Sequence, residues 1–270
     1  MKIAFLGGGN MANALIGGLL AKGFEPRSIS VIEVSPPARE RLAARHGVRA
    51  STAPDAATSA ADTLVLAVKP QDMRAALSAF PGNLNQKLVI SIAAGVRLDA
   101  LSGWLGGHRK LVRCMPNTPA LIGAGITALY ALAEVSPEER KKAETVLGAV
   151  GEVLWVGEER LLDPVTAISG SGPAYVFWFI EQLSASAIKL GIPQETALKL
   201  AVQTVLGAAK LAAQSEESPA ELRKKVTSKG GTTEAALRVF DEEKLAERFA
   251  RALEAASRRG AELADELGKD

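Results

Sequence analysis

The sequence predicts two domains, an α/β domain with a parallel sheet followed by an all-helical domain. Two observations lead to this prediction. In the first part of the chain, short apolar runs alternate with Ala/Leu-rich stretches of helical periodicity, which is the pattern of parallel strands joined by crossover helices. From about Asp163 onward the strand-like runs stop, and long Ala/Leu/Glu/Lys stretches follow one another. We place the boundary near residues 156–163 and expect domains at 1–160 and 161–270.

Six apolar runs are the expected strands of the first domain. Each is short, rich in Val, Ile and Leu, and followed by a turn or a helical stretch. They are residues 2–7, 28–33, 63–69, 87–93, 110–115 and 152–156.

Five long stretches are the expected helices of the second domain: residues 171–190, 194–213, 219–226, 233–240 and 242–267. The segments Ser136-Pro137-Glu138-Glu139 and Ser218-Pro219-Ala220-Glu221 each place Ser at a helix cap, Pro in the first turn and Glu three residues after Ser. Both segments are therefore expected to begin helices. The glycines of residues 169–172 predict a non-helical start to the helix 171–190, closely approached by another part of the chain.

Composition limits the function classes. The chain has 270 residues, 47% hydrophobic, and a net charge of +2 with scattered charged residues, so no basic stripe indicates nucleic acid. One cysteine, Cys114, and two isolated histidines offer neither a disulfide nor a metal site, and Cys114 is expected to be a buried strand residue. No apolar run reaches the roughly 20 residues of a membrane span, and no signal sequence is evident. We expect a cytoplasmic protein without metal.

The helical domain is rich in Ala and poor in aromatic residues, which leaves a thin core for a unit that stands alone. Mutual packing of two chains would remedy this. The sequence therefore predicts a homodimer formed through the C-terminal helices.

A glycine-rich turn follows the first expected strand directly and precedes a helical stretch. Gly7, Gly9 and Ala12 fit the pattern G-x-G-x-x-A of a Rossmann dinucleotide-binding domain. Gly7 permits the tight turn, Gly9 lets the backbone approach a pyrophosphate, and Ala12 allows close packing of helix on strand. Asn10 and Met11 begin the helix, whose N-terminal N–H groups can bind an anion. Glycine-rich turns also occur as simple connectors.

The residues after the second expected strand leave the choice of cofactor open. Glu33 stands where an acidic side chain binds the ribose 2′-hydroxyl of NAD(H). Ser35 and Arg39 could instead hold the 2′-phosphate of NADP(H), which a carboxylate would repel unless it points away. Arg39 could also be an ordinary solvated helix residue.

Three further strand ends are candidate cofactor contacts, because ligands of open α/β sheets bind outside the carboxyl ends of the strands. At each of them a turn follows the strand, and Asn117 lies between two prolines that stiffen the backbone. A plain structural turn would look the same. The residues are Ala67, Val68, Lys69, Pro70, Ala93, Gly95 and Asn117.

A second anion site is predicted in the helical domain. Residues 226–233 place hydroxyl groups and consecutive glycines before a helix, which can form a nest of N–H groups for a carboxylate. The alternative is an ordinary capped turn between two helices.

Taken together, these motifs resemble those of the pyrroline-5-carboxylate reductase family. The resemblance extends along nearly the whole chain through FLGGGNMA, LAVKPQDM, VISIAAGV, VRCMPNTPALIGAG, VTAISGSGPAYVF, LGAAKL and ELRKKVTSKGGTTEAALRVFD. It implies an N-terminal Rossmann domain, an interlocking helical dimerisation domain, often within a ring of dimers, and reduction of L-pyrroline-5-carboxylate to L-proline with NADPH or NADH.

Carried over by position, the resemblance implies a substrate site on residues 228–233. The carboxylate-binding residues are Ser228, Gly230, Gly231, Thr232 and Thr233. Thr233 is expected to bond the ring nitrogen and to be the catalytic residue. Glu216 matches a position that helps to order this region, and Ser35 matches a contact to the adenosine phosphate, which favours NADPH. Lys229 replaces a proline that is usual in the family, which frees a φ angle and adds a positive charge.

Two alternatives remain at this point. One is another two-domain reductase with the same cofactor domain, acting on a β-hydroxyacid or on a different cyclic imine. The hydroxyacid enzymes generally rely on a lysine along the long helix 171–190, where Lys189 is the only lysine and lies near the end. A regulator that senses a dinucleotide without turnover would share the cofactor turn.

Overall fold

The computed structural model describes residues 1–78, 84 and 86–268. By their contacts these residues form two units. Unit 1 is Met1–Ser171 together with Ala256–Asp270, and unit 2 is Gly172–Ala255. This division follows contacts alone, so the expected functional boundary at residues 160/161 stays a prediction.

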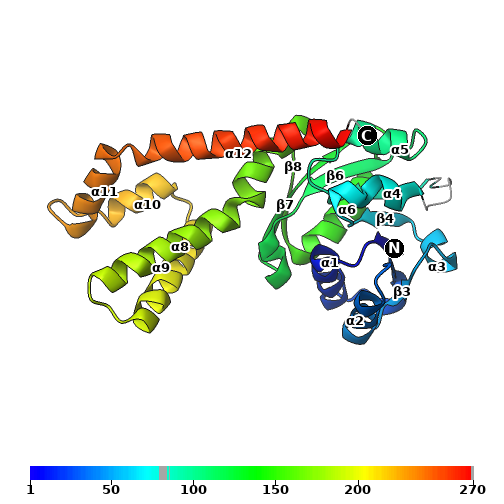
Figure 1. Cartoon of the computed structure of the whole chain (residues 1–270), viewed down its shortest axis with the longest axis horizontal. Coiled ribbons are helices and arrows are strands. Elements are labelled where there is room, and N and C mark those ends of the chain that lie inside the picture. The colour runs from blue at the N-terminus through cyan, green and yellow to red at the C-terminus, as the bar shows by residue number, and fades with distance from the viewer. Residues whose placement is uncertain (79–83, 85, 269–270) are drawn as a thin grey trace. The chain divides into compact units, whose positions relative to one another are not determined.

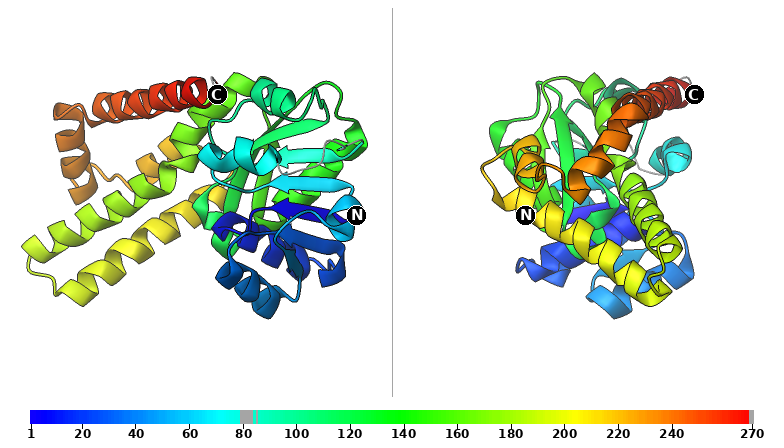
Figure 2. Two further views of the ribbon diagram at one scale, coloured as in Figure 1. Left: turned by 45° about the vertical axis from the view of Figure 1, so that its right-hand side comes forward. Right: turned by 90° about the vertical axis from the view of Figure 1, so that its left-hand side faces the viewer.

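Unit 1 contains an eight-stranded sheet in the order β3-β2-β1-β4-β5-β6-β7-β8. Figure 1 and Figure 2 show the sheet from different sides. The first six strands have the order of a Rossmann domain, with the switch point between β1 and β4. The strands are β1 Ile3–Leu6, β2 Ile29–Ile32, β3 Arg49–Ser51, β4 Thr63–Leu66, β5 Leu88–Ser91, β6 Leu111–Met115, β7 Gly125–Ala131 and β8 Gly151–Trp155.

Strands β1 to β6 are parallel, as expected. The expectation is wrong at one edge of the sheet, because β7 runs antiparallel to β6 and β8 runs parallel to β7, so these two strands run opposite to the other six. The apolar runs also did not reveal β3, which has only three residues, or β7, which begins with glycine. The six strands that were predicted are all present.

The core of unit 1 lies on both faces of the sheet. In β1, Ile3 and Phe5 pack into one apolar cluster, while the alternate residues Ala4 and Leu6 pack into the other. Side chains of successive strand residues point to opposite faces, and both faces of a parallel sheet are covered by helices. Helices α1, α2 and α6 contribute to the first cluster, and α4 and α5 to the second. The helices of this unit are α1 Asn10–Ala21, α2 Pro36–His46, α3 Ala56–Ser59, α4 Met73–Ser78, α5 Leu98–Trp104, α6 Pro137–Leu147 and α7 Leu162–Val165.

Unit 2 is helical. Its helices confirm the five predicted stretches to within a few residues, and α12 continues into the last part of unit 1. They are α8 Gly172–Lys189, α9 Gln194–Gln214, α10 Pro219–Lys225, α11 Thr232–Glu242 and α12 Leu245–Gly268. Both expected capping boxes are present: Ser136 begins α6 and Ser218 begins α10, and each accepts the N–H of the glutamate three residues later.

The expected non-helical start before α8 is wrong. Residues Thr166–Gly170 form a π-helical turn that leads from α7 into α8. The predicted close approach is nevertheless present, because a Cβ at Gly170 would collide with the side chain of Met115. Within the part of the chain that the structure describes, no helix is long and apolar enough to cross a bilayer.

Candidate active site

Two of the three glycines after β1 have a steric reason to be glycine, and the third faces open space. Gly7 has φ of +100°, and a Cβ there would lie 2.8 Å from the carbonyl oxygen of Ala67 at the end of β4. A Cβ at Gly8 would lie 2.5 Å from the side chain of Leu42 and 3.2 Å from a carboxylate oxygen of Glu33. At Gly9 no heavy atom lies within 4 Å of the Cβ position, so the turn leaves open space there.

The open space adjoins the N-terminus of α1. The first intrahelical bond runs from the Asn13 N–H to the Gly9 carbonyl at 2.9 Å, so the N–H groups of Asn10, Met11 and Ala12 have no acceptor within the helix. The helix has no side-chain cap on Gly9 and no acidic residue in its first turn. The partial positive charge of a helix N-terminus and its free N–H groups suit a diphosphate. The residues present therefore fit a dinucleotide, as the fingerprint predicts.

The acidic and basic residues after β2 are held by the backbone. The Glu33 carboxylate accepts the N–H of Gly8 at 2.9 Å and the N–H of Ser35 at 2.8 Å. Arg39 donates to the carbonyl oxygens of Glu33 and Val34 at 2.8 and 2.9 Å. Ser35 is the N-cap residue of α2, but its hydroxyl makes no capping bond. The structure thus brings Glu33, Ser35 and Arg39 together at one corner, next to the glycine turn.

The turn after β4 lies beside the turn after β1. Ala67 donates its N–H to the Leu6 carbonyl at 2.8 Å, and Val68 packs against the second core cluster. Lys69 caps a 3₁₀ turn that begins at Pro70, and α4 starts only after that turn. Residues Ala67 to Pro70 therefore lie at the switch point of the sheet.

The turn after β5 meets the C-terminal end of the chain, which the sequence did not reveal. Ala93 is buried. Gly95 has φ of +78°, and a Cβ there would lie 3.0 Å from Leu267 Cδ1. Arg97 pairs with Asp265 at 2.8 Å. The end of α12 thus packs against a turn whose residues Ala93 and Gly95 were predicted to contact the cofactor.

Asn117 has a structural partner. Its Oδ1 accepts the N–H of Ile126 at 3.0 Å, which ties the loop after β6 to the start of β7. In β6, Cys114 is buried and donates its thiol hydrogen to the Ser91 carbonyl at 3.1 Å. Burial raises the pKa of the Cys114 thiol, so it remains neutral, as expected for a strand residue that does not act as a nucleophile.

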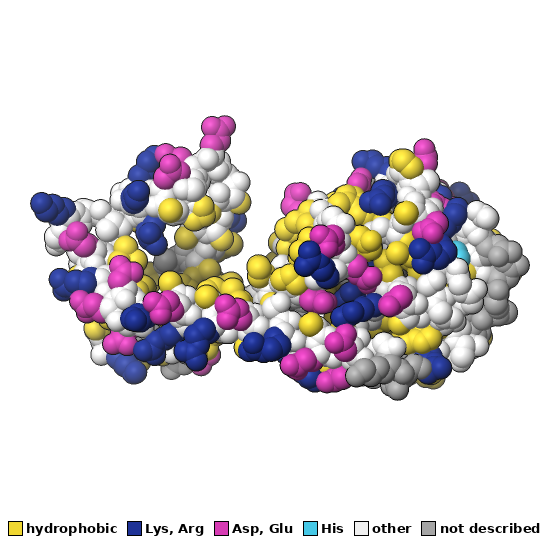
Figure 3. Space-filling view, turned by 90° about the horizontal axis from the view of Figure 1, so that it is seen from above, with side chains coloured by type: hydrophobic (Ala, Val, Ile, Leu, Met, Phe, Trp, Pro, Cys, Tyr) yellow, Lys and Arg dark blue, Asp and Glu magenta, His cyan; other side chains and the backbone are white. Residues whose placement is uncertain are grey.

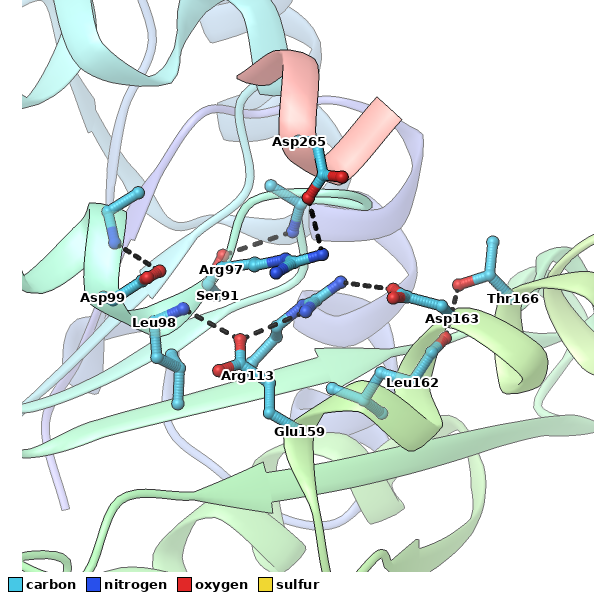
Figure 4. Close-up of polar contacts among 12 residues, drawn as sticks. Ser91, Arg97, Leu98, Asp99, Arg113, Glu159, Leu162, Asp163, Thr166 and Asp265 are labelled. Carbon is cyan, nitrogen blue, oxygen red and sulfur yellow. Dashed lines mark hydrogen bonds and ion pairs between the residues drawn. The ribbon is translucent and has the colours of Figure 1, made fainter. Parts of the chain in front are cut away.

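A buried ion cluster joins β6 to the segment that leads out of the sheet. Arg113 is only 4% exposed at its side chain and contacts Glu159 at 3.1 Å and Asp163 at 3.3 Å. Glu159 also accepts the N–H of Leu98 at 2.8 Å. Figure 4 shows these groups converging from separate elements, with the Arg97–Asp265 pair beside them. No local signal in the sequence could have identified this cluster, because its members are far apart along the chain. Among the described residues, no group of three or more His, Cys, Asp or Glu side chains is arranged to hold a metal.

The predicted carboxylate turn precedes α11 in unit 2. Gly231 donates its N–H to the Ser228 carbonyl at 3.0 Å and is the N-cap residue of α11. Gly230 has φ of +71°, a conformation that glycine adopts readily at the third position of a tight turn. Thr232 and Thr233 form the first turn of the helix. Lys229 is exposed at the second position of the turn.

Glu234 already occupies one N–H group of this turn. Its carboxylate accepts the N–H of Gly230 at 2.6 Å. An open pocket of about 660 Å³ adjoins the turn, and its lining residues are Thr227, Gly230, Gly231, Glu234, Ala235, Leu237, Arg238, Asp241 and Glu242. Glu216 is exposed, while its neighbour Glu217 pairs with Lys225 at 2.7 Å.

Unit 2 exposes much of its apolar surface. Among the described residues of this unit, the buried ones are Ala197 and Ala201, whereas Phe177 is 66% and Trp178 58% exposed. Figure 3 shows apolar side chains among charged ones on the face in view. Further exposed apolar residues are Val176, Phe179, Leu198, Leu206, Leu211, Val239, Phe240 and Phe249. A patch of this kind indicates a protein partner.

Comparisons with known proteins match both parts of the chain. Residues 159–263 match the family model described as pyrroline-5-carboxylate reductase dimerisation, and residues 2–95 match the model described as NADP oxidoreductase coenzyme F420-dependent. A pyrroline-5-carboxylate reductase of Pseudomonas aeruginosa is 45% identical, covering 99% of this chain and 98% of its own length. One of Synechocystis is 42% identical, covering 97% and 98%.

Solved structures agree with these relatives. A pyrroline-5-carboxylate reductase from Coxiella burnetii has a TM-score of 0.92 and 41% identity, covering 97% of this chain and 98% of its own. The Plasmodium falciparum pyrroline carboxylate reductase with NADP bound has a TM-score of 0.85 and 27% identity, covering 98% of both chains. The similarity extends along nearly the full length, and the chain belongs to the pyrroline-5-carboxylate reductase family.

Proposed function

We propose that this protein reduces L-pyrroline-5-carboxylate to L-proline with NADPH, the final step of proline biosynthesis. The observation that carries the proposal is the pair of anion sites in a chain of this family. One is the free N-terminus of α1 after the turn at Gly9, and the other is the Gly230–Gly231 turn at the start of α11. The first suits a diphosphate and the second suits a carboxylate.

Residues of unit 1 hold the cofactor in this proposal. The N–H groups of Asn10 and Met11 bind the diphosphate, and the space beside Gly9 admits it. Ser35 and Arg39 bind the 2′-phosphate of NADPH, because the Ser35 hydroxyl makes no capping bond and the Glu33 carboxylate is turned toward Gly8. NADH serves as the alternative donor. The remaining proposed contacts are Gly7, Ala12, Ala67, Val68, Lys69, Pro70, Ala93, Gly95 and Asn117.

Residues of unit 2 hold the substrate. The N–H groups of Gly230, Gly231 and Thr232, together with the Ser228 hydroxyl, bind its carboxylate at the N-terminus of α11, where negative charge is favoured. The Thr233 hydroxyl bonds the ring nitrogen and helps to relay to it, from solvent, the proton that converts the imine to its iminium. Lys229 adds positive charge beside the carboxylate.

The chemistry depends chiefly on orientation. When bound, the reduced nicotinamide supplies a hydride to the C=N carbon. The substrate reacts as its iminium, whose positive charge already attracts the hydride, so the protein needs no strong acid at the ring nitrogen. Holding the two reactants at the correct distance and angle contributes the larger part of the rate acceleration.

Self-association would bury the apolar surface that unit 2 exposes. The family model that covers residues 159–263 is a dimerisation model, and the exposed aromatic residues of α8 need a partner surface. The chain forms homo-oligomers. We further propose a dimer through the C-terminal helices, assembled into a ring of dimers in the cytoplasm.

The test is the loss of the reduced nicotinamide absorbance band when pyrroline-5-carboxylate is added, with NADPH and NADH in parallel. Turnover with product identified as proline supports the proposal. Binding of dinucleotide without turnover would favour a regulator instead. Turnover of a β-hydroxyacid would favour the related reductases, although Lys189 is the last residue of α8 and so does not stand along that helix.

A further inference from the structure

The side chains of Glu33 and Asn13 form hydrogen bonds with the backbone of the glycine turn, Glu33 with an N–H group and Asn13 with carbonyl oxygens. On the N–H side, the two carboxylate oxygens of Glu33 accept the N–H groups of Gly8 and Ser35 at 2.9 and 2.8 Å. On the carbonyl side, the Asn13 side-chain amide donates to the carbonyl oxygens of Gly8 and Gly9 at 2.8 and 3.1 Å. Gly8 is therefore fixed at both of its hydrogen-bonding groups.

The Asn13 side chain is itself oriented. Its Oδ1 lies 3.2 Å from Nε2 of His46, the last residue of α2. Burial, with a smaller contribution from the charge of Arg45, lowers the pKa of His46, so the imidazole is neutral at neutral pH. A neutral ring that carries its hydrogen on Nε2 donates to Asn13 Oδ1 and leaves the amide group of Asn13 to face the turn.

We propose that Glu33 is a positioning residue for the dinucleotide turn and does not choose between NADPH and NADH. An acidic residue at the end of the second strand is otherwise read as the acceptor of the NADH ribose hydroxyl. Here each of its oxygens is bonded to a backbone N–H, and one oxygen lies 3.2 Å from the Cβ position at Gly8. Charge-assisted bonds to backbone N–H groups are among the stronger hydrogen bonds in proteins. This inference rests on the proposed function, since it requires the turn to bind a dinucleotide.

One consequence concerns the donors that remain for the diphosphate. The Gly8 N–H is committed to Glu33, which leaves the free N–H groups of Asn10, Met11 and Ala12 at the start of α1. Preorganising the turn keeps these groups together before the cofactor arrives, which reduces the ordering cost of binding.

Binding calorimetry on the full chain, without substrate, tests the proposal. In Glu33→Gln, the side chain keeps its size but presents an NH₂ group to one of the two N–H donors. We expect the dissociation constants of NADPH and NADH to rise in parallel by about tenfold, with their ratio unchanged within about twofold. Glu33→Asp keeps the charge, but the shorter side chain cannot reach both N–H groups. We therefore expect both dissociation constants to lie above their wild-type values in this variant as well. Glu40→Gln, an exposed change on α2, is the matched control and leaves both constants unchanged.

Two results in Glu33→Gln would contradict a positioning role for Glu33. Tighter NADPH binding with weaker NADH binding in Glu33→Gln, or unchanged binding of both, overturns the proposal. If Glu33→Gln does not fold, Asn13→Asp places a carboxylate against the carbonyl oxygens of Gly8 and Gly9. That variant should raise both constants in parallel, because it disturbs the carbonyl side of the same turn. Glu33→Asp then tests Glu33 itself, and unchanged binding of both dinucleotides in that variant overturns the proposal. A wild-type chain that binds dinucleotide but leaves pyrroline-5-carboxylate unreduced refutes the proposed reaction alone; one that binds neither dinucleotide refutes both.

Discussion

The carboxylate of Glu234 lies 2.6 Å from the backbone nitrogen of Gly230 and accepts its N–H. This N–H is one of the groups proposed to bind the substrate carboxylate. A substrate carboxylate must therefore displace Glu234 or share the turn with a like charge. Glu234 also lies in the first turn of α11, where a negative charge favours the helix N-terminus.

Glu234→Gln should therefore lower the Michaelis constant for pyrroline-5-carboxylate by about threefold to tenfold, with kcat unchanged, because it removes the competing charge. Steady-state kinetics at saturating NADPH measure the effect. Glu242→Gln is the control, since Glu242 lines the same pocket and has no bond to Gly230. A higher Michaelis constant in Glu234→Gln would mean that Glu234 supports the shape of the turn more than it competes.

Gly230→Ala should weaken the substrate more than the cofactor. Alanine at a φ of +71° costs about 1 kcal/mol, because L-residues disfavour this conformation. If the turn strains or shifts in response, the affinity for the substrate falls by about fivefold. Calorimetry with proline and with NADPH separates the two affinities. Gly103→Ala in α5 is the control, because Gly103 has ordinary φ and open space at its Cβ position. Equal losses for both ligands would contradict a role confined to the substrate.

Thr233→Val should raise the Michaelis constant or lower turnover by about tenfold or more, the scale of about 1.4 kcal/mol. The hydroxyl is lost, while the shape of the side chain at the first turn of α11 is kept. Thr145→Val on α6 removes an exposed hydroxyl that donates to the Lys141 carbonyl at 2.8 Å and should leave kinetics unchanged. Wild-type kinetics in Thr233→Val would exclude the hydroxyl from the mechanism.

Arg113→Met should lower the free energy of unfolding by about 3 kcal/mol, because it leaves the carboxylates of Glu159 and Asp163 without their buried counter-charge. Denaturant titration measures the change. Arg160→Met removes an exposed pair with Glu158 and should leave the midpoint unchanged. An equal effect of the two substitutions would show that burial of the cluster does not determine its contribution.

Glu139 gives a pH dependence of stability. Burial raises the pKa of Glu139, but hydrogen bonds from Lys110 and from the Ser136 N–H, with nearby lysine charges, outweigh it and hold the pKa below its ordinary value. The unfolded chain therefore binds more protons as the pH falls. The stabilisation is present above about pH 4.3 and is lost as the pH falls through the lower folded value. Glu139→Gln should reduce the slope of the unfolding free energy against pH in that range, measured by denaturant titration at several pH values. An unchanged slope would contradict the assignment to Glu139.

Local patterns in the sequence determined much of this protein. Apolar runs located six strands, and the Ser-Pro-x-Glu segments located the starts of α6 and α10. The glycine turn is recognisable from its place between a strand and a helix. These signals depend on residues within a few positions of one another, where backbone geometry fixes which side chains and amides meet.

Only the tertiary structure decided the remaining relationships. It determined that Glu33 faces Gly8, that Leu267 packs against Gly95 and that Arg113 pairs with Glu159 and Asp163. It also determined that β7 and β8 run opposite to the other strands of the sheet. The partners in these contacts are distant in sequence. Strand order and helix packing decide which atoms contact a given carboxylate, guanidinium or glycine Cα. Local periodicity and helix caps do not contain that information.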